Sequence, residues 1–210
     1  VTGVQTCALP ILYIVFMLDN LKKYKVILAS NSPRRKELLS GLGIDYEVRT
    51  LPDVDESYPE TLQGGDIPLY IAREKAAAYR DLMQADELMI TADTIVWLDG
   101  CVLGKPRDRE EALQMLRNLS GRTHEVFTGV CITTTEWQRS FSAQTEVRFA
   151  QLTEEEICWY VDHYRPMDKA GAYGVQEWIG FVGVEYISGS YFNIMGLPVQ
   201  RLYRELKSVE

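Results

Sequence analysis

The sequence has few of the residues that build transition-metal sites and disulfide frameworks. Its 210 residues include two histidines, His124 and His163, and four cysteines that lie far apart in the chain. Because no C-x-x-C pair occurs and no histidine lies beside a cysteine, neither a zinc site nor a thiol redox motif is indicated. Two isolated histidines also give little support to a Ser-His-Asp triad. We expect free thiols in the reducing cytosol, and therefore a cytoplasmic protein.

Positive charge is also scarce. Lysine and arginine together number 22 against 30 aspartates and glutamates, which gives a formal net charge of −8. A broad nucleic-acid or membrane-surface partner requires an excess of positive charge, so we expect neither. A cluster of basic residues in this chain is therefore expected to form a local site. An acidic protein that binds a polyanion also gains from a divalent cation placed between the two.

The apolar run near the N-terminus, residues 11–18, is too short to span a bilayer. It also lacks the basic segment and small-residue cleavage site of a signal peptide. Residues 1–11 resemble a translated sequencing adapter, so we expect residues 1–16 to be a non-native or unstructured leader. The rest of the chain shows no repeat, low-complexity segment or long linker. We expect one domain over residues 17–210, with Met17 as the native start.

The chain is organised around residues 26–39. Residues 26–29 form a continuous apolar run of strand length, and a polar turn follows. Ser32 is a good N-cap residue, and Pro33 suits the first helical position because its missing N–H group would have no partner there. The stretch therefore predicts a buried strand, a turn and the start of a helix.

The first turn of this helix carries three cations in a row, Arg34, Arg35 and Lys36. The helix dipole places partial positive charge at this end, so each cation costs ~0.3–1 kcal/mol. Free N–H groups, hydroxyls and arginines that converge at the carboxyl end of a strand form an anion site, most naturally for phosphate. The alternative is a solvated basic turn whose side chains extend into water.

A carboxylate interrupts a second buried strand. Residues 88–98 are almost continuously apolar except around Asp93. Burying an aspartate is costly unless it is paired or bound to a metal, so Asp93 is the most informative acid in the chain. The alternative is a structural aspartate that accepts hydrogen bonds from backbone N–H groups.

Three further charged residues are candidates for the same site. Lys75 lies beside the apolar stripe of a helix predicted over residues 66–82, with Asp66 as its cap. Lys105 lies between Gly104 and Pro106, which fix a turn that directs the lysine. Glu56 follows two aspartates in an acidic loop. For the lysine of the helix and for the acidic loop, exposure to solvent is the ordinary alternative.

The remaining pattern predicts a mixed α/β fold. Alternating residues 44–49 predict a half-buried strand, and residues 108–119 and 154–164 predict helices, with Thr153 as the cap of the second. A final helix starts at Pro198. Residues 125–134 and 140–149 read as two successive strands with no helix between them. Such a pair favours a mixed sheet over an all-parallel one.

Several motifs resemble those of one family. They are Ser30-Asn31-Ser32-Pro33-Arg34-Arg35, Ala92-Asp93-Thr94, Gly104-Lys105-Pro106 and the glycine-rich segment from Asp168 to Gln176. The chain resembles the Maf family of nucleoside triphosphate pyrophosphatases from about Tyr24 to Leu206. The resemblance implies a single α/β domain with a mixed twisted sheet flanked by helices. It also implies two lobes around a central cleft, as in Maf- and ITPase-like proteins.

The resemblance also implies roles for individual residues. Asp93 matches the general base and, with Glu56, the carboxylates that hold a divalent cation, Mg²⁺ or Mn²⁺. The residues expected to contact the triphosphate are Ser30, Ser32, Arg35, Lys75 and Lys105. Arg34, Thr94 and Gln176 match the positions that determine which base is bound, and Gln176 can pair with the amide edge of a pyrimidine.

This combination resembles the subgroup that hydrolyses dTTP and UTP to the nucleoside monophosphate and pyrophosphate. Two alternatives stay open: the same chemistry on a modified purine such as methylated GTP, and a regulator of cell division that binds nucleotides without turnover. The presence of Asp93, Glu56 and Lys105 favours an enzyme, because a sensor needs no base. A homodimer also stays open, since no apolar stripe requires one.

Overall fold

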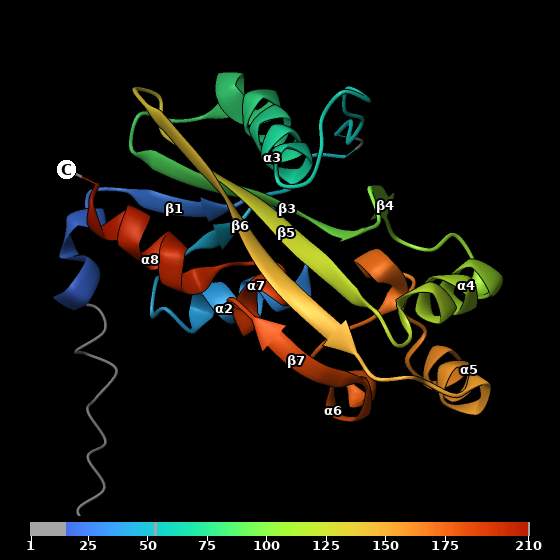
Figure 1. Ribbon diagram of the computed structural model, residues 1–210. Coiled ribbons are helices and arrows are strands. Elements are labelled where there is room, and N and C mark those ends of the chain that lie inside the picture. Colours follow the sequence, from blue (N-terminus) through green and yellow to red (C-terminus); the bar gives the residue numbers. More distant parts are fainter. Residues whose placement is uncertain (1–15, 53, 210) are drawn as a thin grey trace, which may run out of the picture.

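The strand that begins the anion-binding stretch lies next to the strand that carries Asp93. In the computed structural model, which describes residues 16–52 and 54–209, these are two strands of one mixed sheet in the order β2-β1-β3-β5-β6-β7, with β4 also paired to β3 (Figure 1). The strands are β1 (Lys25–Leu28), β2 (Glu47–Val48), β3 (Glu87–Leu98), β4 (Cys101–Leu103), β5 (Thr123–Thr133), β6 (Gln138–Phe149) and β7 (Val184–Ser188). Residues 1–15 of the expected leader lie outside the described residues.

The sheet confirms the predicted mixed topology. β1 runs parallel to β2 and β3, whereas β5, β6 and β7 follow β3 in antiparallel pairs. The α-helices are α2 (Pro33–Ser40), α3 (Asp66–Tyr79), α4 (Arg109–Leu119), α5 (Glu154–Tyr164), α6 (Trp178–Gly183), α7 (Tyr191–Ile194) and α8 (Val199–Lys207). Short 3₁₀ turns are η1 (Phe16–Leu21), η2 (Arg80–Leu82) and η3 (Ala170–Ala172).

Helices cover both faces of the sheet and one of its ends. α3 packs on one face, against β3, β5 and β6, and Figure 1 shows α2, α7 and α8 on the opposite side. α4 and α5 pack against each other beyond the end of β5. Among residues 16–52 and 54–209, no helix is both long and apolar enough to cross a membrane.

The register of β1 on β3 positions the candidate site. Leu28 lies opposite Ile90, and the Ala29 N–H donates to the Ile90 carbonyl at 2.9 Å. Beyond this point β1 ends, whereas β3 continues through Asp93 to Leu98. The turn after β1 therefore lies beside the part of β3 that carries Asp93.

The local signals for two helix starts are confirmed. Ser32 is the N-cap of α2, where its side chain accepts from the Arg35 N–H, and Pro33 is the first helical residue. Thr153 caps α5 in a capping box with Glu156.

Two other local predictions were wrong in detail. Asp66 does not cap α3, because the N-cap is Gly65 and Asp66 is already the first helical residue. The strand predicted over residues 44–49 is reduced to Glu47–Val48, both exposed. Within the described sheet β2 pairs with β1, a strand of four residues, so few backbone hydrogen bonds are available to extend it.

Gly129 on β5 is required by close packing against α3. A Cβ atom at this position would lie 2.3 Å from the carbonyl carbon and oxygen of Pro68 and 2.4 Å from the Leu69 nitrogen. These are backbone atoms, so a side chain here can be accommodated only if the helix moves away from the sheet.

We predict that Gly129→Ala lowers the free energy of unfolding by ~2 kcal/mol or more, since overpacking a close contact forces the backbone to shift. Gly104→Ala is the control, because no atom lies within 4 Å of its Cβ position, and its effect should stay within ~0.5 kcal/mol. Urea unfolding followed by circular dichroism measures both. Equal stabilities of the two variants would contradict the packing argument.

Candidate active site

The residues predicted from sequence come together around one cleft of about 760 Å³. The cleft is lined by all of them: Ser30, Ser32, Arg34, Arg35, Glu56, Lys75, Asp93, Thr94, Lys105 and Gln176. They come from the turn after β1, the start of α2, the loop before α3, α3 itself, β3, the loop after β4, and the segment between η3 and α6. Segments far apart in sequence therefore converge on one site.

An ion-paired trio lies in the cleft. The Lys75 ammonium contacts Glu56 Oε1 at 2.7 Å and Asp93 Oδ1 at 2.8 Å. The side chains of Lys75 and Asp93 are each 13% exposed. The costly carboxylate of β3 is thus compensated by a lysine of α3, which answers the question that the sequence left open. Burial acts to raise the pKa of Glu56, but the hydrogen bond and charge of Lys75 outweigh it and hold that pKa below its usual value.

Arg35 has a different environment. Its guanidinium donates to the Gly196 carbonyl at 2.8 Å, to Thr94 Oγ1 at 3.1 Å and to Ser30 Oγ at 3.4 Å. All three acceptors are neutral. Burial lowers the pKa of Arg35, and the charge of Asp93 partly opposes this shift. Among the described residues, therefore, this half-buried cation has no directly bonded carboxylate to neutralise it.

Ser30 and Ser32 keep their hydroxyl protons available. Ser30 Oγ accepts from the Ser32 N–H at 3.2 Å and from Arg35, and Ser32 Oγ accepts from the Arg35 N–H at 3.4 Å. Each hydroxyl acts as an acceptor in these contacts. Both can therefore donate to an anion bound beside Arg35.

Thr94 belongs to a hydroxyl chain whose direction is fixed. Thr128 Oγ1 donates to the Asn193 carbonyl at 3.1 Å, since a carbonyl can only accept. Thr128 must then accept the hydrogen bond from Thr94 Oγ1, at 2.9 Å, and Thr94 accepts from Arg35. The Thr94 proton is already used, so this side chain offers a ligand an acceptor only.

The neighbouring residues Thr128 and Gly129 of β5 both support the site. Thr128 is fully buried and supports Thr94 and hence Arg35, while Gly129 makes room for α3. Thr128 was not predicted as a site residue. No periodic pattern distinguishes a hydroxyl that supports a site from one that fills a strand.

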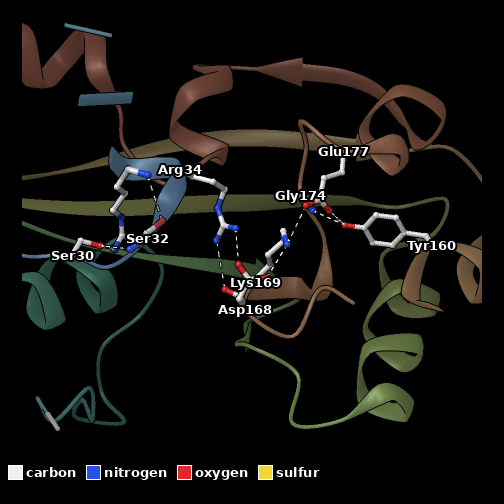
Figure 2. Close-up of polar contacts among 9 residues, drawn as sticks. Ser30, Ser32, Arg34, Tyr160, Asp168, Lys169, Gly174 and Glu177 are labelled. Atoms are coloured by element: carbon white, nitrogen blue, oxygen red, sulfur yellow. Dashed lines mark hydrogen bonds and ion pairs between the residues drawn. The ribbon is translucent and has the colours of Figure 1, made fainter. Parts of the chain in front are cut away.

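A chain of charged groups lies on the other side of the cleft (Figure 2). Arg34 Nη1 donates to Asp168 Oδ2 at 2.9 Å, and Lys169 Nζ contacts Asp168 Oδ1 at 2.8 Å and Glu177 Oε1 at 3.1 Å. Tyr160 then donates to Glu177 Oε2 and accepts from the Gly174 N–H at 3.0 Å. Sequence reasoning missed Tyr160 and Glu177, which lie outside the motif that ends at Gln176.

Gln176 and Lys105 complete the cleft. Gln176 Oε1 is buried and has no hydrogen-bond partner within residues 16–52 and 54–209, so its acceptor capacity is unused there. Lys105 is exposed, and its turn is held in place because the Gly171 N–H donates to the Gly104 carbonyl at 3.0 Å. This contact ties the lysine's loop to η3.

The acidic pair is suited to a divalent cation. Glu56 and Asp93 each place one carboxylate oxygen within 2.8 Å of the same ammonium, so the two groups converge. Within the described ranges, no group of three histidine, cysteine, aspartate or glutamate side chains forms a complete protein cage. Two carboxylates are nevertheless sufficient for Mg²⁺, which usually binds one or two together with waters and substrate phosphates.

We predict that Lys75→Met raises the pKa of Glu56, because it removes the opposite charge that holds this pKa down while the desolvation remains. A pH titration of the side-chain carboxyl by NMR measures the shift. Lys105→Met is the matched control: Lys105 acts on Glu56 through space without a hydrogen bond, so the shift should be smaller. An unchanged Glu56 pKa in Lys75→Met would contradict the arrangement.

The sequence is similar to curated bacterial proteins along almost its whole length. A dTTP/UTP pyrophosphatase of Bacteroides thetaiotaomicron is 72% identical over 193 residues, which cover 92% of this chain and 100% of that protein. One from Bacteroides fragilis is 70% identical with the same coverage of both chains. A more distant relative of the same name, from Flavobacterium johnsoniae, is 44% identical and covers 91% of this chain and 98% of its own length.

Comparison with solved structures finds a HAM1 protein from Coxiella burnetii, which is 15% identical at a TM-score of 0.46 and covers 87% of this chain and 98% of that one. The profile of the family described as Maf-like protein matches residues 25–209, close to the range expected from the motifs. The chain therefore belongs to the Maf family.

Proposed function

We propose that this protein hydrolyses dTTP and UTP to the nucleoside monophosphate and pyrophosphate. One observation carries the proposal: a half-buried guanidinium, bonded among the described residues only to neutral oxygens, lies in the same cleft as a converging pair of carboxylates. The first feature suits a polyphosphate and the second suits the cation that accompanies it. The names of the similar proteins support the choice of substrates.

The polyphosphate would lie against Arg35, Ser30 and Ser32. Arg35 supplies a positive charge with no directly bonded carboxylate among the described residues, and the two hydroxyls supply donors at the start of α2, where the helix dipole also favours an anion. Lys105 also lines the cleft and has no ion-pair partner among the described residues. These groups neutralise the pyrophosphate as it leaves.

Glu56 and Asp93 would hold a divalent cation, Mg²⁺ or Mn²⁺. When bound, the cation neutralises charge on the phosphate oxygens and draws the triphosphate toward the acidic side of the cleft. Lys75 supports the same pair of carboxylates from α3. Its contact with both of them makes it a positioning residue for the acidic pair as well as a cation near the phosphates.

Asp93 is suited to activate the attacking water. Lys75 contacts its Oδ1, and within residues 16–52 and 54–209 no group donates a hydrogen bond to Oδ2, so this oxygen can accept a proton. The water oxygen forms a bond to the α-phosphorus, the bond from that phosphorus to the α–β bridging oxygen breaks, and Asp93 takes the proton. The leaving group is pyrophosphate and the other product is the monophosphate.

Gln176, Arg34 and Thr94 are proposed to read the base. The buried Gln176 Oε1 can accept from the N3–H of uracil or thymine, while Nε2 donates to a ring carbonyl. Thr94 offers the base an acceptor only, because its hydroxyl proton is already donated to Thr128. The expected partner is therefore a small-molecule nucleoside triphosphate. A cytoplasmic location is also proposed, supported by the free cysteines at positions 101, 131 and 158.

We expect pyrophosphate release with Mg²⁺ or Mn²⁺ to be led by dTTP and UTP across a panel that includes CTP, dATP, GTP, ITP and methylated GTP. A coupled pyrophosphate assay with chromatography of the monophosphate measures it, on protein that begins at Met17. If a purine nucleotide gives the fastest release, the proposed hydrolysis stands and the proposed preference for uracil and thymine is wrong. Tight nucleotide binding without release would replace the enzyme with a nucleotide-binding regulator.

We expect Asp93→Asn to lower kcat at least about a hundredfold, because the neutral amide cannot take the proton from water. Nucleotide affinity, measured by isothermal titration calorimetry, should stay within about threefold. Asp162→Asn is the control, since it removes an exposed carboxylate paired with Arg109 on the surface. Retained turnover in Asp93→Asn would remove the base role from this residue.

A further inference from the structure

The charge chain beside the cleft links Arg34, which is proposed to read the base, to the residue next to Gln176. At one end is Arg34 of α2, and at the other is Glu177, directly after Gln176. Between them lie Asp168 and Lys169, so the signs alternate along the chain. Figure 2 shows these side chains in sequence, ending at the Tyr160 ring of α5. An unbroken series of polar contacts therefore runs from Arg34 to Glu177, the residue that follows Gln176 in the chain.

The inner part of this chain is largely removed from water. The side chains of Lys169 and Glu177 are 9% and 17% exposed, and Tyr160 is fully buried. In such surroundings each group depends on its partners, because an unpaired buried charge or polar atom is costly. The chain therefore favours a single arrangement of the segment that contains Gln176.

Glu177 is also packed closely over Gly174. A Cβ atom at Gly174 would lie 2.8 Å from the Glu177 carboxyl carbon, 3.0 Å from its Oε2 and 3.1 Å from Gln176 Nε2. The Gly174 N–H donates to the Tyr160 hydroxyl, which in turn donates to Glu177. The Gly174 backbone and the Glu177 carboxylate are thus held by the same hydroxyl, and the Gln176 amide lies beside them at this turn.

The orientation of the glutamine amide matters for base recognition. An amide with Oε1 toward N3 and Nε2 toward the neighbouring exocyclic group accepts from the N3–H of uracil and donates to its carbonyl. Turned over, the same amide donates to N3 of cytosine and accepts from its amino group. A glutamine free to rotate cannot distinguish the two bases. Discrimination requires its surroundings to fix one orientation.

We propose that Tyr160 and Glu177 are positioning residues for base selectivity: they fix the turn that carries Gln176, and through Lys169 and Asp168 they set it relative to Arg34. This inference rests on the proposed function. Neither Tyr160 nor Glu177 lines the cleft, so each acts through Gln176 and Arg34 and not by touching the nucleotide. The phosphate side of the cleft, formed by Ser30, Ser32 and Arg35, has its own separate contacts.

The test compares Tyr160→Phe with Tyr164→Phe. Both changes remove one phenolic hydroxyl from the same helix, and the two rings stack at 5.0 Å. Only the Tyr160 hydroxyl holds Glu177 and Gly174, whereas Tyr164 is 38% exposed. The readout is the ratio of kcat/KM for UTP to that for CTP. In the same variants, inhibition by added pyrophosphate reports on the phosphate side of the cleft.

We expect Tyr160→Phe to lower the UTP-to-CTP ratio about tenfold, since small misplacements of a recognition group have large effects on rate. Tyr164→Phe should keep the wild-type ratio, and the pyrophosphate inhibition constant should stay within about twofold in both. Glu177→Gln, which removes the charge but keeps the shape, should shift the ratio in the same direction. This second variant keeps the test valid if Tyr160→Phe folds poorly.

Two results would overturn the proposal. One is an unchanged ratio in both Tyr160→Phe and Glu177→Gln, and the other is an equal loss of rate with UTP and CTP, which indicates a purely structural role. Failure of the proposed function is distinguishable from either. In that case the wild-type protein itself releases no pyrophosphate from UTP or dTTP.

Discussion

The parallel pairing of β1 with β3 is the constraint on which the cleft depends. β1 ends opposite Ile90, three residues before Asp93, so the turn that starts α2 is held next to the carboxylate of the neighbouring strand. α3 then packs on the same part of the sheet and brings Lys75 to Asp93, and Gly129 allows this close approach. A different register would separate the proposed anion-binding turn from the proposed base.

Charge compensation divides the cleft into two kinds of environment. Lys75 is matched by two carboxylates, so the protein alone supplies both signs at the acidic pair. Among the described residues, Arg35 is hydrogen-bonded only to neutral oxygens, and we propose that a bound anion supplies its direct partner. The acidic net charge of −8 makes this contrast more significant. In a strongly basic protein, an arginine without a bonded carboxylate would be weaker evidence for an anion-binding site.

The elements that could be predicted from sequence are those specified locally. Ser32 and Thr153 predict helix starts because an N-cap side chain bonds to a backbone N–H no more than three residues further along the chain. The burial of Asp93 indicated that a partner had to exist, but not that the partner is a lysine of α3. The Thr128 hydroxyl chain and the Tyr160–Glu177 contact could not be predicted, because each depends on elements that only tertiary packing brings together. The short length of β2 could not be predicted either, because β2 forms by pairing with β1, which lies beside it only in the folded chain.

The consecutive arginines at the start of α2 have different partners: a carboxylate for Arg34, and hydroxyl and carbonyl oxygens for Arg35. Arg34 is paired with the Asp168 carboxylate, so much of its positive potential is cancelled, whereas Arg35 keeps its charge among hydroxyl and carbonyl oxygens. A phosphate would therefore favour Arg35, although both residues lie in the same helical turn. The unfavourable position of two cations at a helix N-terminus is thereby explained without a solvated basic turn. Arg34 is paired within the protein, and Arg35 is the arginine that we propose binds the anion.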